Sequence, residues 1–237
     1  MTVRLALSLA VLAFALPPAE AQVTGPNLRA YVTLANDYFN RGLSQANGDG
    51  SVQLGIDYRH DNGFFAGGWA GNTEYAADEW RDDERGHEVD YYVGYDRRLH
   101  DVRLTFTLSR YTYPGAGRDY DYGEVAGNVW FRDRVFFSVS YTDDLLGRGE
   151  SATNREAGVA WPLAWNLELG ATVGRVRLAE AHGGGYDHWN VGVSKLAGRF
   201  AVDLRYHDSD YPYASYLGGG AGRWVLSVSY GIQAGGL

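Results

Sequence analysis

The feature that most constrains this chain is an alternation of apolar and polar side chains that recurs along most of its length. In residues 52–59 the even positions carry Val, Leu, Ile and Tyr, and the odd positions carry Gln, Gly, Asp and Arg. Residues 89–96, 102–109 and 200–207 follow a similar rule. Because a β-strand points successive side chains to opposite sides, each stretch predicts a strand with one apolar and one mostly polar face.

Two architectures fit such strands. In a soluble β-sandwich the apolar faces look inward, whereas in a transmembrane β-barrel they look outward to lipid and the polar faces line the lumen. The alternation does not choose between them. The choice depends on export, strand length, loop rhythm and aromatic placement.

The N-terminus has the layout of a secretory signal peptide. Arg4 precedes an apolar run from Leu5 to Leu16, and Ala19-Glu20-Ala21 supplies a small-x-small cleavage site before Gln22. We therefore expect residues 1–21 to be removed and residues 22–237 to form a single domain. The chain has no cysteine, which excludes disulfides, and no later apolar run reaches the roughly 18 residues of a membrane-spanning helix.

The alternation predicts about twelve strands, most of them about 9 to 13 residues long, which suits a tilted transmembrane strand. They fall near Asn27–Phe39, Ser51–His60, Gly63–Thr73, His87–Arg97, Asp101–Tyr113, Tyr120–Phe131, Arg134–Thr142, Asn154–Trp161, Trp165–Arg177, Tyr186–Leu196, Phe200–Asp208 and Gly222–Gln233. The gaps between them are alternately long and short, which is typical of extracellular loops and periplasmic turns. An even strand number places both termini in the periplasm.

Aromatic residues gather where the predicted strands end. Trp161 and Trp165 flank one short turn, Trp224 opens the last strand, and several tyrosines lie beside the long loops. Amphipathic rings prefer the headgroup level of a membrane. An aromatic core in a soluble sandwich is the alternative, but a sandwich rarely alternates short and long loops so regularly. The fold prediction is an all-β, antiparallel, up-and-down transmembrane barrel.

The net charge of −8 argues against nucleic acid as a partner, because binding a polyphosphate requires a basic surface. The partners that we expect are outer-membrane lipid and lipopolysaccharide, the barrel-assembly machinery and small solutes.

Three segments also carry a family resemblance, Asn36–Gln45, Gln53–Tyr58 and Gly63–Ala70. Together they resemble the N-terminal signature of the TorF-type porin family, proteobacterial outer-membrane proteins of largely unassigned function. The likeness is specific over residues 31–72 and weaker as far as residue 131. The chain departs from the pattern at Gly50-Ser51-Val52, where the family usually has a Pro-Ala pair. The resemblance implies an outer-membrane barrel with a porin-type function.

Parity along the strands assigns charged residues of both signs to the lumen. In one interpretation they pair with each other and satisfy a polar interior, and in the other they select the solutes that pass. Because eight strands enclose a filled interior and sixteen an open channel, about twelve predict a narrow, selective or plugged pore. The candidate lumen residues are Asp57, Arg59, Asp90, Arg103, Glu124, Glu168, Asp203 and Arg205, together with Arg41.

Arg41 belongs to Arg41-Gly42-Leu43-Ser44-Gln45 in the first long loop. This segment could fold inward, so that Arg41 meets an anion or a lumen carboxylate. The simpler interpretation is a loop conformation that Gly42 permits and side-chain hydrogen bonds hold.

Two other classes of function compete with a channel. A lipid-modifying enzyme needs a nucleophile beside a base, and Ser138 and Ser140 lie near no histidine in a recognisable motif. A structural or adhesive barrel would use its long loops without conducting. No spacing of His or carboxylates predicts a metal site or another cofactor. We expect an outer-membrane porin, not an enzyme, that passes small hydrophilic solutes by passive diffusion.

Overall fold

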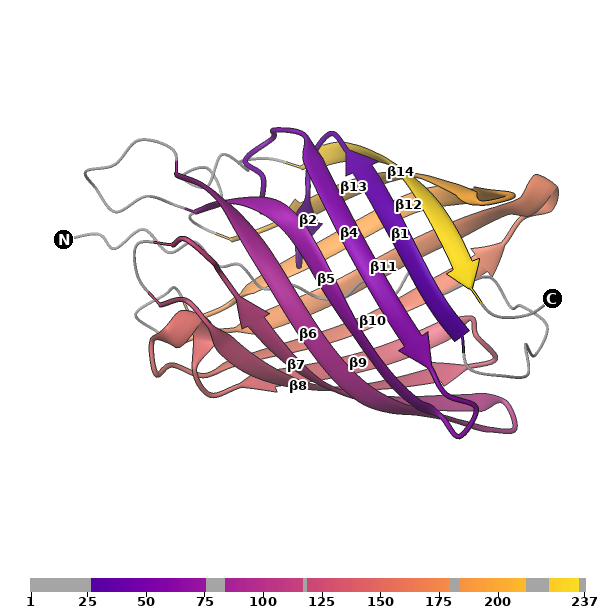
Figure 1. Cartoon of the computed structure of the whole chain (residues 1–237), viewed down its shortest axis with the longest axis horizontal. Helices are drawn as coiled ribbons and strands as arrows, with labels where there is room; N and C mark the ends of the chain where they lie inside the picture. Colours follow the sequence, from indigo (N-terminus) through magenta and orange to yellow (C-terminus); the bar gives the residue numbers. More distant parts are fainter. Residues whose placement is uncertain (1–26, 76–83, 117–118, 180–183, 212–221, 235–237) are drawn as a thin grey trace.

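The computed structural model describes residues 27–75, 84–116, 119–179, 184–211 and 222–234. Twelve of its strands form one closed antiparallel barrel (Figure 1). Each strand from β4 to β14 pairs with the next in sequence, and β1 closes the barrel by pairing with both β14 and β4. The predicted up-and-down barrel of about twelve strands is confirmed. Among the described residues, no helix has the length and apolarity to cross a membrane.

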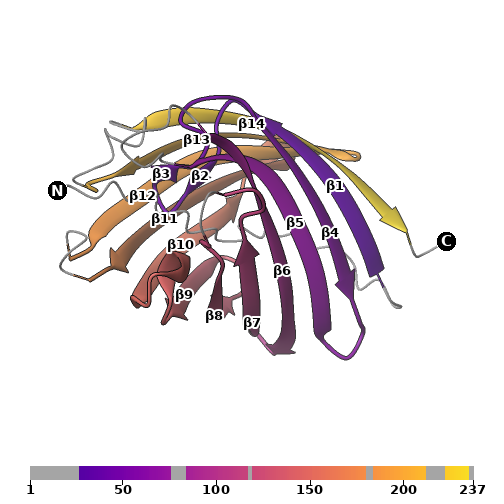
Figure 2. The ribbon, with the colours of Figure 1, turned by 60° about the vertical axis from the view of Figure 1, so that its left-hand side comes forward.

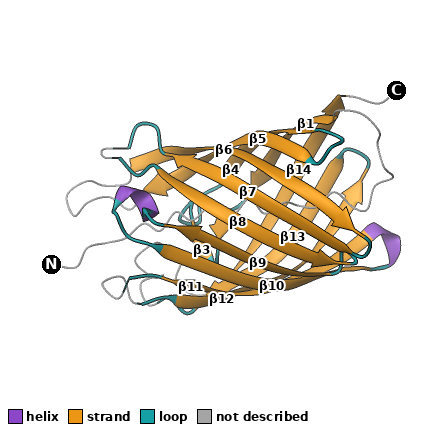
Figure 3. Ribbon diagram, turned by 90° about the horizontal axis from the view of Figure 1, so that it is seen from below, coloured by secondary structure: helices purple, strands orange, loops and turns teal. Residues whose placement is uncertain are grey.

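The barrel strands have the following bounds. They are β1 (Asn27–Ala35), β4 (Ser51–Arg59), β5 (Phe64–Tyr75), β6 (Glu84–Leu99), β7 (Val102–Thr112), β8 (Tyr122–Phe131), β9 (Val135–Thr142), β10 (Ala152–Pro162), β11 (Leu167–Arg177), β12 (Tyr186–Ala197), β13 (Phe200–Ser209) and β14 (Arg223–Ala234). Two shorter strands, β2 (Phe39–Asn40) and β3 (Leu43–Ser44), form a separate hairpin. Two 3-10 turns, Leu145–Gly147 and Ala164–Asn166, lie at opposite ends of the barrel (Figure 3).

The alternation in the sequence becomes the two faces of the wall. Leu54 and Ile56 of β4 are exposed on the outside, whereas Gln53 and Asp57, on either side of this pair in the sequence, face inward. Phe137 and Val173 are each 62% exposed on the outer face, so the barrel presents large apolar side chains outward. This arrangement is the reverse of a soluble fold and is typical of a barrel surrounded by lipid.

At one end of the barrel, tight turns join neighbouring strands, and the backbone of these turns suits the twist of the strands. Arg132 and Asp133 both have positive φ, at 52° and 51°, between β8 and β9. Two consecutive left-handed residues are the requirement of a type I′ hairpin. The strand ends that the longer connections join lie at the other end, which we call the loop end, in contrast to this turn end.

The predicted strand limits agree with the structure within two residues, apart from the end of the first strand and the start of the fourth. The first strand ends at Ala35 rather than Phe39, because Asn36 exchanges hydrogen bonds with the backbone of β14 and the chain then leaves the wall. The strand predicted from His87 to Arg97 is longer and runs from Glu84 to Leu99. Trp165 lies in a 3-10 turn rather than in β11, with a positive φ of 62°.

Glycine allows aromatic rings to lie against the inner wall. A Cβ added to Gly67 would lie 2.3 Å from the hydroxyl oxygen of Tyr92, and one on Gly55 would lie 2.1 Å from the ring of Tyr31. Both distances are far below a normal van der Waals contact. The missing side chains therefore let these rings pack flat on the neighbouring strand, which positions the Tyr92 hydroxyl against Asp57.

Burial inside the barrel is uneven. A cluster of buried apolar residues lies at the loop end and includes Leu43, Tyr111, Tyr122, Leu145 and Tyr186. Toward the turn end, inward side chains such as Asp57, Arg59, Glu168 and Arg205 remain partly exposed. The interior is thus packed at the loop end and more open at the turn end.

Candidate functional site

The loop end of the lumen contains the hairpin of β2 and β3, which lies within the outline of the barrel (Figure 2). Its position follows from Asp37, whose side chain is fully buried. One carboxylate oxygen of Asp37 accepts hydrogen bonds from the Ser44 hydroxyl and the Tyr38 amide, each at 2.7 Å. The other accepts from Arg223 of β14 at 2.7 Å. Asp37 therefore fastens the base of the hairpin to the wall.

Arg41 at the tip of the hairpin reaches across the lumen. Its Nη2 donates to both carboxylate oxygens of Glu124 on β8, at 2.8 and 2.9 Å, and lies 2.8 Å from the Ser140 hydroxyl on β9. The side chains of Arg41 and Glu124 are 1% and 5% exposed. The hairpin thus bridges the lumen from β14 to β8 and β9.

The backbone conformation at the tip of the hairpin explains why glycine occupies position 42. Arg41 and Gly42 both have positive φ, at 46° and 77°, which a tight two-residue turn requires. A Cβ at Gly42 would also lie 2.6 Å from the Cβ of His188 and 2.8 Å from the carbonyl oxygen of Asp208. Gly42 therefore lets the hairpin lie directly against β12 and β13.

Tyrosines surround this contact. The rings of Tyr111 and Tyr122 stack with centroids 4.6 Å apart, and the Tyr111 hydroxyl donates to Glu124 at 3.4 Å. On the opposite side Phe39 stacks on His207 at 4.9 Å. These rings exclude water from the ion pair, so its electrostatic strength exceeds that of an exposed pair.

Two pKa values outside the strands reflect this environment. Burial alone would lower the pKa of the Arg41 guanidinium, but the carboxylate of Glu124 raises it above its ordinary value. Burial raises the pKa of Tyr113 well above its usual range, and Glu88 adds to the effect. Arg41 therefore stays charged and Tyr113 stays neutral at every ordinary pH.

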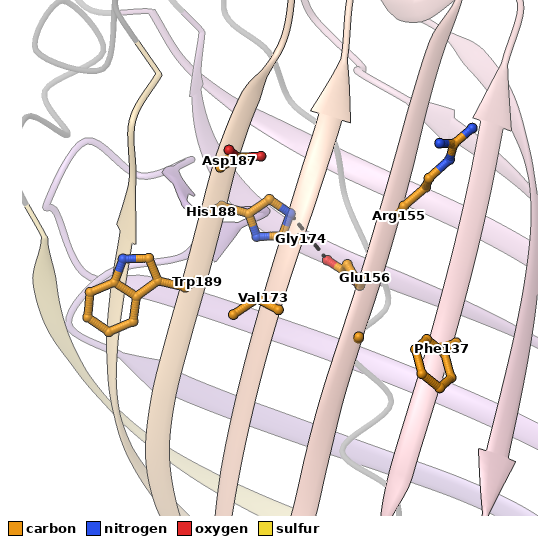
Figure 4. A pocket seen from close by; sticks show the side chains of 9 residues that line it. Phe137, Arg155, Glu156, Val173, Gly174, Asp187, His188 and Trp189 are labelled. Carbon is orange, nitrogen blue, oxygen red and sulfur yellow. Dashed lines mark ion pairs between the residues drawn. The ribbon is translucent and has the colours of Figure 1, made fainter.

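The wall near the hairpin also carries carboxylates. Glu88 and Asp90 on β6 are 0% and 1% exposed, and Asp90 lies directly across from Tyr111 in the β6–β7 register. On β10 and β12, Glu156 lies 3.6 Å from His188, which also contacts Asn154 at 3.2 Å. The contact between Glu156 and His188 is drawn as a dashed line in Figure 4.

The turn end of the lumen holds a separate set of charges. Asp57 accepts a hydrogen bond from Tyr92, and Arg59 lies 3.9 Å from Asp96 and over the ring of Phe65. Arg103 lies 3.4 Å from Asp133 and stacks on Trp130. Across the barrel, Arg205 donates to Asp203 at 3.0 and 3.2 Å and to Asn190 at 2.8 Å. Charges of both signs therefore line the more open half.

The predicted lumen residues divide into two groups. Arg41, Glu124 and Asp90 lie at the loop end, where Arg41 and Glu124 are in contact. Asp57, Arg59, Arg103, Glu168, Asp203 and Arg205 face the lumen toward the turn end. The structure combines the two interpretations of the Arg41 segment, because Arg41 contacts the lumen carboxylate of Glu124 and the turn itself depends on the positive φ of Gly42.

Sequence reasoning missed three partners of the hairpin, Asp37, Arg223 and Ser140. The stop in alternation at Asn36-Asp37 is the signal that could have marked the first of them. Ser140, which the sequence offers as a candidate nucleophile, hydrogen-bonds with Arg41. Among the described residues, no group of three or more His, Asp or Glu side chains is arranged to hold a metal ion.

Comparison with known proteins identifies a family and a fold. A family model described as a bacterial protein of unknown function (Gcw_chp) matches residues 19–230. No curated protein matches the sequence.

Several solved structures resemble the barrel at low sequence identity. The KdgM porin in complex with disordered oligogalacturonate has a TM-score of 0.54 at 9% identity, covering 86% of this chain and 98% of its own. The COG4313 outer membrane channel from Pseudomonas putida F1 has a TM-score of 0.53 at 9% identity, with 92% and 99% covered. The NanC porin has a TM-score of 0.50 at 11% identity, with 90% and 100% covered. These similarities establish a fold shared with outer-membrane porins and channels.

Proposed function

This chain belongs to the Gcw_chp family of bacterial proteins of unknown function, and we propose that it is an outer-membrane porin whose lumen is narrowed by the β2–β3 hairpin. Small hydrophilic solutes would cross it by passive diffusion, without catalysis. The observation that carries this proposal is the buried contact of Arg41 with Glu124 and Ser140, which fixes an inward-folded loop segment across the barrel.

The contact of Arg41 with Glu124 and Ser140 would allow the β2–β3 hairpin to be displaced. Two other donors of Arg41, Nε and Nη1, are buried and have no hydrogen-bond partner among the described residues. A buried polar network that is only partly satisfied stabilises less than a complete one. The hairpin is therefore held firmly enough to narrow the lumen, yet it could move aside when solute or voltage favours the open form.

Selectivity would arise in the turn-end half. Asp57, Arg59, Arg103, Glu168, Asp203 and Arg205 lie on the inner wall there and place both signs of charge in a confined space. Charged residues in a narrow aqueous path discriminate among ions by their fields. Most of these charges already have a partner of opposite sign, so we expect weak rather than strong ion preference.

The cellular placement is part of the same proposal. Residues 1–21 would direct export, both termini would lie in the periplasm, and the loop end would face the cell surface. The barrel-assembly machinery would insert the chain, and lipopolysaccharide would surround its outer half. The three segments that resemble TorF-type porins favour the same assignment. The KdgM structure, which holds an oligogalacturonate, makes short polar oligosaccharides a reasonable first class of solute to test.

Single-channel conductance in a planar bilayer tests the proposal. The refolded protein should give discrete low-conductance steps, and Glu124→Gln should give larger steps because it releases the tip of the hairpin. Arg132→Gln serves as the control, since it breaks an exposed ion pair with Asp101 in a tight turn, remote from the hairpin. If Glu124→Gln and the parent conduct equally, the hairpin is not the constriction.

A non-conducting barrel is the second candidate, and one observation favours it. The buried cluster of Leu43, Tyr111, Tyr122, Leu145 and Tyr186 fills the loop end with apolar side chains. Such a plug would suit a structural or adhesive barrel. Insertion without conductance in both the parent and Glu124→Gln would select this candidate over the porin.

A further inference from the structure

The outer face of the barrel carries an unusual group of arginines at the loop end. Arg155 of β10 and Arg175 of β11 are directly opposite each other in the strand register, and both point outward. Arg177, the last residue of β11, lies on the same face two positions further on. Like charges directly opposite one another destabilise a sheet, so this arrangement requires a compensating anion.

The protein supplies only part of that compensation. Arg175 donates to both oxygens of Asp187 at 2.9 Å, in a pair that is more than half exposed. Within the described ranges, Arg155 and Arg177 have no side-chain ion pair or hydrogen bond. Asp210 lies beside Asp187, and its carboxylate accepts a hydrogen bond from the Asp187 amide at 2.6 Å, on the side of β12 away from Arg155 and Arg177. Asp208 also faces outward, but it lies on β13, on the far side of Trp189 from Arg155.

An apolar groove lies next to these arginines on the side toward the turn end. Phe137, Ala157, Val173 and Trp189 form one outward row across β9 to β12. They line a pocket together with Arg155 and Asp187. Figure 4 shows Phe137 and Trp189 on either side of Val173, with Arg155 extended toward β9. The small Ala157 and the branched Val173 between the two rings form the floor of the groove.

Arg155, Arg175 and Arg177 lie at the height on the barrel where lipid headgroups are expected. Arg175 lies eight residues along β11 from Leu167. At about 3.3 Å per residue and a tilt of about 40°, this separation is roughly 20 Å along the barrel axis. The apolar band of an outer-membrane barrel is about 25 Å tall. Arg155, Arg175 and Arg177 are therefore at the boundary where lipid phosphates begin.

We propose that Arg155, Arg175 and Arg177 bind the phosphate group of a phosphorylated glycolipid in the outer leaflet, with an acyl chain of that lipid in the groove between Phe137 and Trp189. Guanidinium groups form paired, charge-assisted hydrogen bonds with phosphate. An aromatic ring on each side fixes the position of the chain. The inference rests on the proposed outer-membrane orientation but not on conduction.

The test measures lipid binding by native mass spectrometry of the refolded protein in detergent micelles. The probes are diphosphorylated lipid A, the same lipid stripped of both phosphates, and inorganic phosphate. The parent should retain diphosphorylated lipid A, and Arg155→Gln with Arg175→Gln should weaken retention at least tenfold. Arg110→Gln is the matched control, because Arg110 is another outward arginine near the loop end but lies on β7 beside Asp121.

Three results would overturn the proposal. They are equal retention by the double variant, equal retention of the dephosphorylated lipid, and displacement of the lipid by millimolar inorganic phosphate, which would indicate a free-anion site. Arg155→Lys with Arg175→Lys keeps the charge and should retain most binding, which separates charge from loss of fold. A conductance measurement on the same samples reports on the channel proposal independently.

Discussion

Arg41 and Glu124 are separated by 83 positions in the sequence, yet the Arg41 guanidinium contacts both oxygens of the Glu124 carboxylate at 2.8 and 2.9 Å. One belongs to a short hairpin and the other to the barrel wall. Loss of this contact should therefore destabilise the inward-folded segment and, in the proposed porin, widen the lumen.

The first prediction concerns the energy of this pair. Arg41→Ala leaves the Glu124 carboxylate buried without its partner, and we expect it to lower the free energy of unfolding by about 3 kcal/mol. Adding Glu124→Gln to Arg41→Ala should cost less than the sum of the two single changes, because the double variant leaves no buried charge unpaired. Urea unfolding in lipid vesicles, followed by tryptophan fluorescence, measures all three. Strictly additive losses would argue that the two side chains do not interact in the membrane.

A second prediction follows from the raised pKa of Arg41. A group whose pKa is raised in the folded state contributes stability below its unfolded pKa and loses it only as pH rises through the folded value. For Arg41 that loss lies above the ordinary pH range, because even an unperturbed arginine keeps its proton throughout that range. Parent conductance should therefore be constant between pH 7 and pH 11. Arg41→Lys should resemble the parent at pH 7 and show larger steps at pH 11, because a lysine loses its proton at a lower pH than an arginine in the same place. Larger steps in the parent at pH 11 would mean that another group holds the hairpin.

The third prediction compares the effects of Arg59 and Arg103 on ion selectivity. Both are predicted lumen residues, but their exposure differs. The side chain of Arg59 is 38% exposed, whereas that of Arg103, which lies beside Asp133 and over the ring of Trp130, is 15% exposed. Arg59→Glu should thus shift the reversal potential in a salt gradient toward cations more than Arg103→Glu does. An equal shift, or none in either variant, would place the ion path elsewhere in the barrel.

The fourth prediction uses glycine as a probe of the inner wall. Gly67→Ala forces the Tyr92 ring away from β5 and from Asp57, and we expect a loss of about 1–3 kcal/mol in unfolding free energy. Gly127→Ala is the control, since a Cβ there meets nothing within 4 Å. Thermal unfolding on heat-modifiable gels compares the two. If both variants lose equal stability, backbone freedom rather than ring packing explains Gly67.

The features that the sequence predicted are local, and those that it missed depend on contacts between distant strands. Period-two alternation predicted the strands and their inward and outward faces, because side-chain direction in a strand depends only on position parity. Loop rhythm predicted the antiparallel meander. The same patterns missed where β1 ends, since Asn36 and Asp37 leave the wall through contacts with β14 that no local pattern encodes.

The sequence by itself determined that this chain forms a barrel with an apolar outside and a charged inside. Only the tertiary structure decided which charges meet. Arg41 contacts Glu124, and Arg155 faces Arg175, because barrel closure and strand register bring distant positions to the same height. Alternation is a local property and survives in the sequence, whereas register is set by the whole ring of strands at once.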